Sequence, residues 1–229
     1  MKSKRYKKLL EKTNELPSAK IDSVLNLIKS NCTTKFDESV DLSFRINNKQ
    51  KKNEVNLRTV VNLPGGTGKS IKVAVVCEES KIDEAKNANA DVVGGDDLVE
   101  KIKNGDLNFE KLICTPSMMI KLSKLGKVLG PKGLMPNPKL GTVTNDISKA
   151  VKEAKAGQVE IRNDKDGNIG LSIGKKSFDD DKIIKNYLAV IDALEKEKSN
   201  LTIKGDLVKQ VFITSSMGVS YKLKLDKSF

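Results

Sequence analysis

The chain has 229 residues, of which 42 are Lys or Arg, 30 are Asp or Glu and none is His, so its net charge is +12. Without histidine, catalysis loses its commonest acid–base residue and metal sites lose their commonest ligand. The three cysteines lack a C-x-x-C spacing, so we expect no metal site and no disulfide framework. No apolar run approaches the roughly 18 residues of a membrane span and no apolar segment follows the basic N-terminus, so we expect a cytoplasmic protein without a membrane partner.

In the first 63 residues the spacing of apolar residues changes from that of a helix to that of a strand. Residues 20–30 have the helical period, which predicts a helix with one apolar face. Residues 36–47 alternate apolar and polar positions, which predicts a half-exposed strand. The polar run 47–54 predicts a loop, and 56–63 predicts a second strand that ends at a Pro-Gly-Gly turn. The apolar positions are Ile21, Val24, Leu25 and Ile28 in the helix and Val40, Leu42, Phe44 and Ile46 in the strand.

Gly68, Lys69 and Ser70 follow this turn and raise the question of nucleotide binding. The phosphate-binding pattern G-x-x-x-x-G-K-[ST] requires glycine where Leu63 stands. It also requires a helix after the loop, whereas residues 71–76 form a β-branched run that predicts a strand. We therefore prefer a glycine-rich hinge that enters a strand. A nucleotide hydrolase using Gly68, Lys69 and Ser70 is the disfavoured alternative.

The central segment alternates strands with helices, which predicts a small parallel sheet. A loop rich in glycine, proline and lysine follows the helix that begins at Pro116. The last helix of the segment carries Ile147, Val151 and Ala154 on one face and ends at Gly157. The predicted strands are 71–76, 91–93 and 111–114, and the other predicted helices are 81–88 and 97–103.

The C-terminal segment returns to alternating strands. Residues 158–174 predict a hairpin around the DKDG sequence at 164–167. Residues 179–181 are three aspartates, which suit the start of a long helix. Residues 209–225 contain two strand-like runs that are broken at 215–218. The apolar stripe predicted for the long helix is Ile184, Tyr187, Leu188, Ile191 and Leu194.

Similar strands at both ends and αβ units between them predict two domains. The fold class is an α+β split domain with an antiparallel sheet, from residues 1–65 and 158–229, plus an inserted α/β Rossmann-like domain, 66–157, with a small parallel sheet. Residues 66–157 carry a net charge of +3 and the remainder carries +9. This charge favours a polyanion bound mainly by the split domain, with lysines that only solvate the surface as the alternative. Aromatic residues make up only 4% of the chain, which argues against stacking on single strands.

Three segments carry a resemblance to one family. They are "TKFDESVDL" at 34–42, "LGKVLGPKGLMPNPKLGTV" at 125–143 and "TSSMG" at 214–218. The sequence resembles the large-subunit ribosomal protein L-one family, the protein of the mobile stalk beside the tRNA exit site. The shorter matches "LRTVVNLPGGTGK", "RNDKDGNI" and "GKKSF" occur in the same order, so the resemblance covers nearly the whole chain. It implies that 64–69 is an interdomain connection that binds no nucleotide.

The resemblance also implies a function. We expect a structural constituent of the large ribosomal subunit that binds 23S ribosomal RNA at the stalk, mostly through the split domain, and that takes part in translation and in release of E-site tRNA. In bacteria it further implies a translational repressor that binds its own operon mRNA. On the same resemblance the protein is expected not to be an enzyme, to need no cofactor and to be a monomer when free. A DNA-binding architectural protein shares the charge and is another alternative.

The residues that match the family's RNA-binding motifs define the predicted site. Lys35 and Phe36, at the start of the first strand, would meet a phosphate and a ribose or base. Ser215 and Ser216 would bond to 2′-hydroxyls, Met217 would press on sugars, and Gly218 would allow close backbone approach. The alternatives are core packing for Phe36, a plain turn at 215–218 and a solvated side chain for Lys175. The full set is Lys35, Phe36, Lys175, Thr214, Ser215, Ser216, Met217 and Gly218.

Two further predictions concern the inserted domain. Lys132, Asn137 and Lys139 lie in its glycine–proline loop, where they either contact RNA or tRNA or only brace the domain. Gly66 and Gly157 stand at the two crossings between the domains, which predicts a hinge whose opening exposes the RNA surface.

Overall fold

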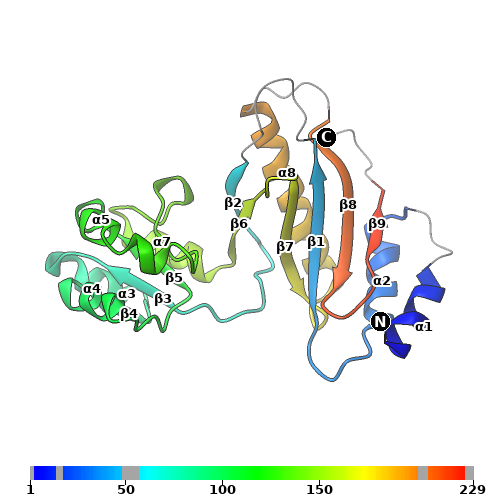
Figure 1. Ribbon diagram of the computed structural model, residues 1–229, viewed down its shortest axis with the longest axis horizontal. Coiled ribbons are helices and arrows are strands. Elements are labelled where there is room, and N and C mark those ends of the chain that lie inside the picture. Colours follow the sequence, from blue (N-terminus) through cyan, green and yellow to red (C-terminus); the bar gives the residue numbers. More distant parts are fainter. Residues whose placement is uncertain (1–2, 14–17, 48–56, 201–205, 225–229) are drawn as a thin grey trace. The chain divides into compact units, whose positions relative to one another are not determined.

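The computed structural model describes residues 3–13, 18–47, 57–200 and 206–224 (Figure 1). The chain folds into two compact units. The terminal unit comprises Met1–Gly68 and Val159–Phe229, and the central unit comprises Lys69–Gln158.

A four-stranded antiparallel sheet organises the terminal unit. Its strands are ordered β7-β1-β8-β9, and each strand alternates buried and more exposed residues. In β1 the buried positions are Val40, Leu42, Phe44 and Ile46, as the alternation predicted. The antiparallel sheet of the predicted fold class is therefore confirmed. The strands are β1 Ser39–Ile46, β7 Asn168–Lys175, β8 Val208–Ser215 and β9 Tyr221–Leu223.

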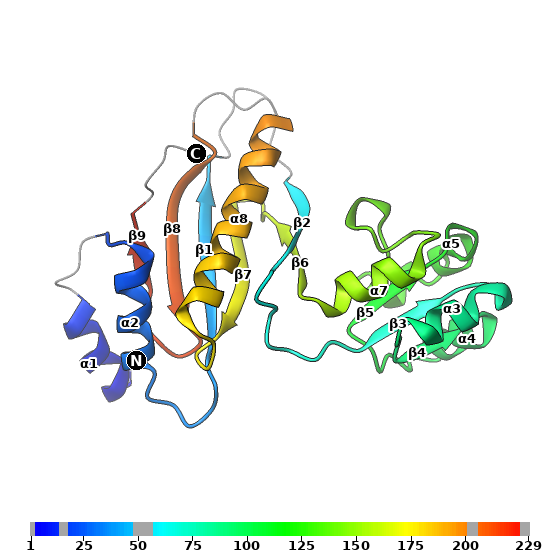
Figure 2. The same ribbon diagram turned by 180° about the vertical axis from the view of Figure 1, so that it is seen from behind.

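Helices α2 (Ile21–Asn31) and α8 (Asp180–Asn200) cover one face of this sheet (Figure 2). The predicted face of α2 is confirmed, because Val24, Leu25 and Ile28 are buried. The predicted stripe of α8 is confirmed at Ile191 and Leu194, which are buried, and Ile184 and Tyr187 pack against the same core. It is wrong at Leu188, which is 52% exposed. The apolar residues that α8 buries are Ile183, Val190, Ile191 and Leu194.

A buried asparagine lies among the apolar residues that α8 turns to the core. Asn186 lies on the core-facing side of α8 and is fully buried. Its amide nitrogen donates to the carbonyls of Ile173 at 2.6 Å and Gly66 at 3.0 Å, and its oxygen accepts from the Gly65 N–H at 2.8 Å. Because both groups of its amide are hydrogen-bonded, this polar side chain is stable on the core-facing side of the helix, where the sequence pattern predicts only apolar residues.

The predicted hairpin over 158–174 is wrong in its strand pairing. The turn itself forms, because the Asp164 carboxylate accepts from the Asn168 N–H at 2.6 Å. The two strands then separate: β6 (Gln158–Arg162) pairs with β2 (Arg58–Asn62) in a two-stranded sheet, and β7 pairs with β1. The competing partner β1 lies more than 100 residues away in sequence, so local turn chemistry did not reveal it. The predicted loop at 47–54 lies, except for residue 47, outside the described residues.

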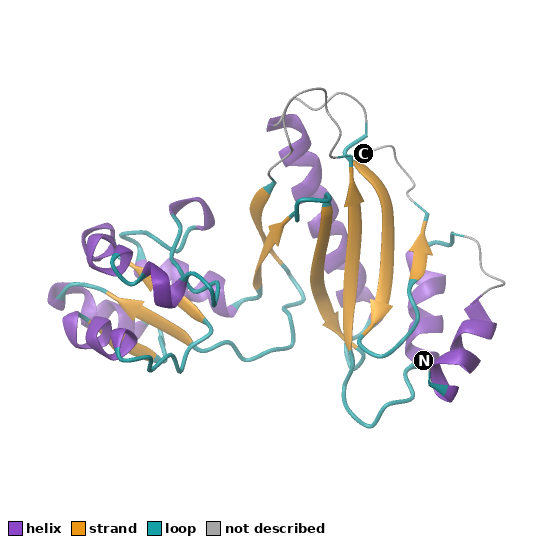
Figure 3. Cartoon of the chain, viewed as in Figure 1, coloured by secondary structure: helices purple, strands orange, loops and turns teal. Residues whose placement is uncertain are grey.

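The central unit contains a three-stranded parallel sheet, ordered β4-β3-β5 (Figure 3). All four residues of β3 are buried, as expected for the middle strand of a parallel sheet covered on both faces. Helices α3 and α7 pack on one face, and α4, α5 and α6 pack on the other. The predicted parallel sheet is confirmed. The strands are β3 Val73–Val76, β4 Val92–Gly94 and β5 Lys111–Cys114; the helices are α3 Ile82–Asn87, α4 Asp96–Lys103, α5 Pro116–Ser123, α6 Gly126–Leu129 and α7 Ile147–Lys155, with short 3-10 helices at Glu79–Lys81 and Pro138–Leu140.

The Gly-Lys-Ser segment leads into strand β3, as predicted, and not into a helix. The protein therefore lacks, at this position, the helix N-terminus on which a phosphate-binding loop depends. The backbone explains why glycine occupies position 68: its φ is +71°, and a Cβ there would lie 3.0 Å from the ring of Phe178. The left-handed backbone and the close aromatic ring both require glycine.

Candidate nucleic-acid interface

Three loops meet at one end of the four-stranded sheet, the lower end in Figure 1. The strand register brings them together, because Ser39 at the start of β1 pairs with Lys175 at the end of β7, and Val40 pairs with Ser215 at the end of β8. We call this region the loop end and define it as residues 34–38, 175–178 and 214–218. It contains every residue of the predicted primary RNA-binding set.

Lys35 and Phe36 lie in a loop that precedes β1, which corrects their predicted position at the start of that strand. The strand begins only at Ser39. The side chain of Phe36 is 53% exposed, so the alternative of core packing does not hold. An exposed aromatic ring offers a flat apolar surface on which a ribose or base can lie.

The 214–218 turn is fastened to the start of β1. The N–H of Ser216 donates to the carbonyl of Ser39, and the N–H of Ser39 donates to the hydroxyl of Ser216, both at 3.0 Å. Met217, at the tip, is 51% exposed. The loop end therefore presents two large apolar side chains, Phe36 and Met217, on backbone that is held by hydrogen bonds.

Glu38 is a site residue that the sequence reasoning missed. It is fully buried, and its carboxylate accepts from the Thr34 hydroxyl at 2.7 Å and from the Met217 N–H at 3.1 Å. The hydroxyl of Ser215 also bonds to it. One carboxylate thus joins the 34–38 loop to the 214–218 turn. The signal was present: Glu38 is in phase with the buried positions Val40, Leu42, Phe44 and Ile46 of the strand pattern.

The pKa of Glu38 reflects these contacts. Burial alone raises the pKa, but the hydrogen bonds from Thr34, Ser215 and Met217 outweigh it and hold the pKa below its usual value of 4.5. The carboxylate is therefore ionised at neutral pH. As a charged acceptor it makes stronger hydrogen bonds than a neutral group would.

Ser215 and Gly218 complete this buried arrangement. Ser215 is only 4% exposed, so its hydroxyl positions the turn from within; its direct contact to RNA stays a prediction. A Cβ on Gly218 would lie 2.3 Å from the Ser215 Oγ. Glycine at 218 therefore lets the turn close over the side chain of Ser215. The close approach of RNA to the backbone of Gly218 stays a prediction.

The third loop of the loop end is tied to the first. The Asp37 carboxylate accepts from the N–H of Ser177 at 3.0 Å and from its hydroxyl at 2.8 Å. The N–H of Lys176 donates to the Glu38 carbonyl at 2.8 Å. Lys175 itself is half-buried, with its stem beside Gly68.

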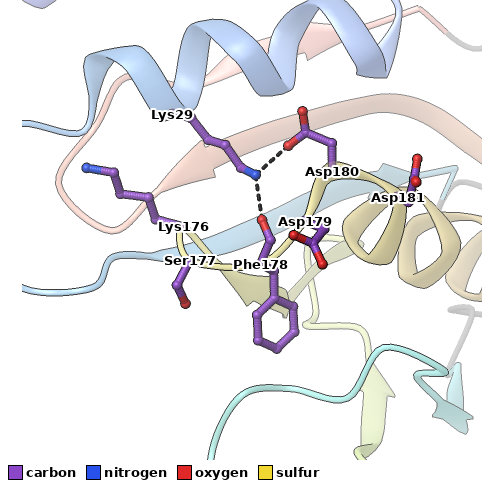
Figure 4. A pocket seen from close by; sticks show the side chains of 7 residues that line it. All are labelled: Lys29, Lys176, Ser177, Phe178, Asp179, Asp180 and Asp181. Atoms are coloured by element: carbon purple, nitrogen blue, oxygen red, sulfur yellow. Dashed lines mark hydrogen bonds and ion pairs between the residues drawn. The ribbon is translucent and has the colours of Figure 1, made fainter.

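A hollow beside this loop lies at the start of α8 (Figure 4). Its lysines serve the protein itself: the Lys29 ammonium donates to the Phe178 carbonyl at 2.5 Å and pairs with the Asp180 carboxylate, and the Lys176 ammonium donates to the Cys32 carbonyl at 2.9 Å. We assign it no ligand. It is lined by Lys29, Lys176, Ser177, Phe178, Asp179, Asp180 and Asp181.

The glycine–proline loop of the central unit, residues 130–142, is held by local bonds. The Asn137 side-chain oxygen accepts from the Lys139 N–H at 2.9 Å, and the Asn137 N–H donates to the Thr142 hydroxyl at 2.7 Å. Asn137 therefore braces this central loop. Lys132 and Lys139 are exposed, and their predicted contact with RNA or tRNA stays a prediction.

Among the described residues, no helix has the length and apolar character needed to cross a membrane. In the same ranges, no three His, Cys, Asp or Glu side chains gather as metal ligands would. Cys32, Cys77 and Cys114 are buried thiols, and burial raises the pKa of Cys114 to about 11.

Comparison with known proteins identifies the family. Residues 28–219 match the model of the Ribosomal protein L1p/L10e family. The chain is 71% identical to the large ribosomal subunit protein uL1 of Pelagibacter ubique over 228 residues, which is 100% of both chains. It is 45% identical to uL1 of Mycoplasma capricolum, with 97% of this chain and 98% of that protein covered, and 46% identical to uL1 of Methylibium petroleiphilum, with 96% and 94% covered. The resemblance inferred from three motifs is confirmed: the chain belongs to the Ribosomal protein L1p/L10e family, whose members are structural components of the ribosome and not enzymes.

Proposed function

We propose that the protein is a constituent of the large ribosomal subunit that binds a folded region of 23S ribosomal RNA at the mobile stalk, and that the loop end is its RNA-binding surface. One observation carries the proposal. Phe36 and Met217 are both about half exposed, on two loops that share the buried carboxylate of Glu38. Apolar side chains on a backbone that is already held can supply contact area at a small cost in ordering entropy.

The chemistry of the loop end suits RNA. Folded RNA is recognised by shape, by phosphates and by 2′-hydroxyls. Lys35 and Lys175 supply positive charge for phosphates, and Phe36 and Met217 supply flat or adaptable apolar surface for riboses and bases. Ser216, which is exposed, supplies a hydroxyl at the same edge. Because the hydrogen bonds between these loops already exist in the free protein, little ordering entropy is lost on binding.

We propose two further roles that follow from the family. The same loop end binds the protein's own operon mRNA, so that translation is repressed when ribosomal RNA sites are scarce. The exposed Lys132 and Lys139 of the central loop meet E-site tRNA during its release. Both RNAs are polyanions, and both interactions are therefore expected to weaken with salt. The free protein acts as a cytoplasmic monomer.

We also propose that a split domain, 1–65 and 158–229, carries an inserted domain, 66–157, through a hinge at Gly66 and Gly157. Gly66 has φ +73° and Gly157 has φ +103°, values that other residues rarely adopt. Paired labels, one in each domain, test the hinge in solution. A separation that changes when RNA is added supports it, and an unchanged separation contradicts it.

The first test is binding to the stalk region of 23S RNA over a salt series. We expect tight binding that weakens steeply with salt, by about 0.7 to 0.9 in log–log slope for each phosphate neutralised. Ser216→Val combined with Met217→Ala should weaken binding at least about tenfold, the order of two lost contacts. Ile120→Ala removes a side chain that is 73% exposed on the central unit and should leave binding unchanged. Binding that is insensitive to salt, or equal affinity for duplex DNA, would contradict the proposal.

A further inference from the structure

Helix α1 (Lys4–Thr13) carries an unusual charge arrangement. Its first five residues include four cations, Lys4, Arg5, Lys7 and Lys8, and its one carboxylate, Glu11, comes only later. Lys4, Lys7 and Lys8 are exposed, whereas Leu9 is buried and Arg5 is half-buried. The helix therefore packs through one face and presents the lysines on the other.

This arrangement is electrostatically unfavourable in the free protein. Cations in the first turn lie at the positive end of the helix dipole, where carboxylates are favoured. Lys4 and Lys8 are four residues apart and Lys4 and Lys7 are three apart, so like charges are neighbours on the helix surface. An anionic group bound at this end of the helix would relieve both effects.

Arg5 fastens this helix to the loop end. Its guanidinium donates to the Thr33 hydroxyl at 3.0 Å, and its second terminal nitrogen donates to the carbonyl of Met217. Thr33 directly precedes the 34–38 loop, and Met217 is the tip of the 214–218 turn. The planar guanidinium thus contacts two loops that are far apart in the sequence, which the single ammonium of lysine cannot reproduce in the same geometry.

We propose that α1 is part of the RNA-binding surface: Lys4, Lys7 and Lys8 contact the phosphate backbone of the RNA whose sugars and bases lie against Phe36 and Met217, and Arg5 positions the helix and Met217 together. The proposal rests on the proposed function and extends it to the N-terminal helix. It accounts for the four cations at the positive end of α1, because a bound polyanion would make their placement favourable. Arg5 acts as a positioning residue, because its two bonds are made to the protein.

The test compares two triple variants of the full chain with the same net charge. Lys4→Gln, Lys7→Gln and Lys8→Gln remove the lysines of α1, whereas Lys86→Gln, Lys101→Gln and Lys103→Gln remove exposed lysines of the central unit. With the stalk RNA fragment as ligand, the α1 variant should lose about tenfold or more in affinity at physiological salt. Its salt slope should fall by about two units, as for two to three lost phosphate contacts. The control should stay within about twofold, which measures the effect of net charge alone.

A second measurement separates binding from folding. The α1 triple variant should melt at the same temperature as the wild type or higher, because it relieves repulsion within the helix. Arg5→Lys keeps the charge, so it should leave the salt slope unchanged while it weakens affinity several-fold. Amide hydrogen exchange in α1 should slow when RNA binds to the wild type.

Distinct outcomes would overturn the proposal. If the wild type binds the RNA and both triple variants bind equally well, α1 lies outside the RNA surface. If the wild type instead binds vesicles of anionic lipid, and the α1 variant loses vesicle binding but not RNA binding, the helix serves a membrane and the proposal is wrong. If the wild type binds no stalk RNA, the proposed function itself fails, and this result is distinguishable from the other two.

Discussion

The loop end of the terminal unit and the central loop both expose lysines, yet they are held in different ways. At the loop end, the buried carboxylate of Glu38 accepts hydrogen bonds from Thr34 and Met217, two residues that lie far apart in the sequence. In the central loop, Asn137 and Thr142 bond to each other across five residues. One surface therefore depends on the tertiary fold, and the other is formed by its own short segment.

This difference bears on what each surface can do. A surface assembled from distant segments is fixed only when the whole unit is folded, and it can present side chains at defined separations. A locally braced loop keeps its shape even when the surrounding contacts loosen, but it presents fewer elements. Variants that remove one brace at a time should therefore affect the two surfaces differently.

Glu38→Ala should have the largest effect. It removes the buried carboxylate that accepts from Thr34, Ser215 and Met217. Hydrogen bonds to charged groups contribute about 1.5–3 kcal/mol each, so we expect a loss of about 3 kcal/mol or more in the free energy of unfolding. Affinity for stalk RNA should fall with it, because the two loops lose their common contact. Urea unfolding measures the change. The matched control, Glu100→Ala, alters an exposed carboxylate of α4 and should change stability by less than about 0.5 kcal/mol. Equal stability of the two variants would contradict the role assigned to Glu38.

The pH dependence of stability should reveal the same carboxylate. The folded-state pKa of Glu38 lies below its usual value of 4.5, so its ionised form contributes stability that is fully present above pH 4.5 and is lost as the pH falls through the folded-state pKa. Glu38→Gln cannot titrate. We therefore expect the stability difference between wild type and Glu38→Gln to be constant near neutral pH and to narrow below pH 4.5. A difference that widens on acidification would show that the sign is wrong.

Gly218→Ala should have an intermediate effect. The added methyl would lie 2.3 Å from the Ser215 Oγ, which forces the hydroxyl away from Glu38 and costs about 2 kcal/mol, the usual range for overpacking. Ser215→Ala in the same chain removes the clash. The double variant should therefore lose less free energy of unfolding than the sum of the losses of the two single variants. Gly126→Ala is the control, because no atom lies within 4 Å of its added Cβ, and it should be neutral or slightly stabilising. Strict additivity of Gly218→Ala and Ser215→Ala would contradict the close contact.

Much of the fold follows from local patterns. The alternation in residues 36–47 predicted β1 and its buried face, and the αβ succession predicted the parallel sheet of the central unit. These elements were predictable because their burial is regular along the chain. The burial of Asn186 on α8 was not, because it depends on bonds to Gly65, Gly66 and Ile173, none of which lies on the helix.

The candidate site was predictable in part for the same reason. The motifs located Phe36 and the 214–218 turn, but they placed Phe36 on a strand. Glu38 has a buried position in the alternating pattern, yet a glutamate is usually exposed, so its burial follows only from the donors that the fold brings to it. Arg5 was missed because its partners, Thr33 and Met217, come together only in three dimensions. Residues that act by joining distant loops leave little trace in a local pattern.

Asn137→Ala should have the smallest effect and gives the sharpest contrast with the loop end. The side-chain oxygen of Asn137 caps the 3-10 helix Pro138–Leu140 through the Lys139 N–H, and loss of such a cap costs about 1 kcal/mol. Because this brace lies wholly within the central loop, affinity for stalk RNA should stay within about twofold of the wild type, even where the loop itself loosens. The same RNA-binding assay, run beside Met217→Ala, provides the comparison. If Asn137→Ala weakens stalk RNA binding as much as Met217→Ala does, then the central loop contacts the same RNA, and the separation of the two surfaces that their different bracing suggests is wrong.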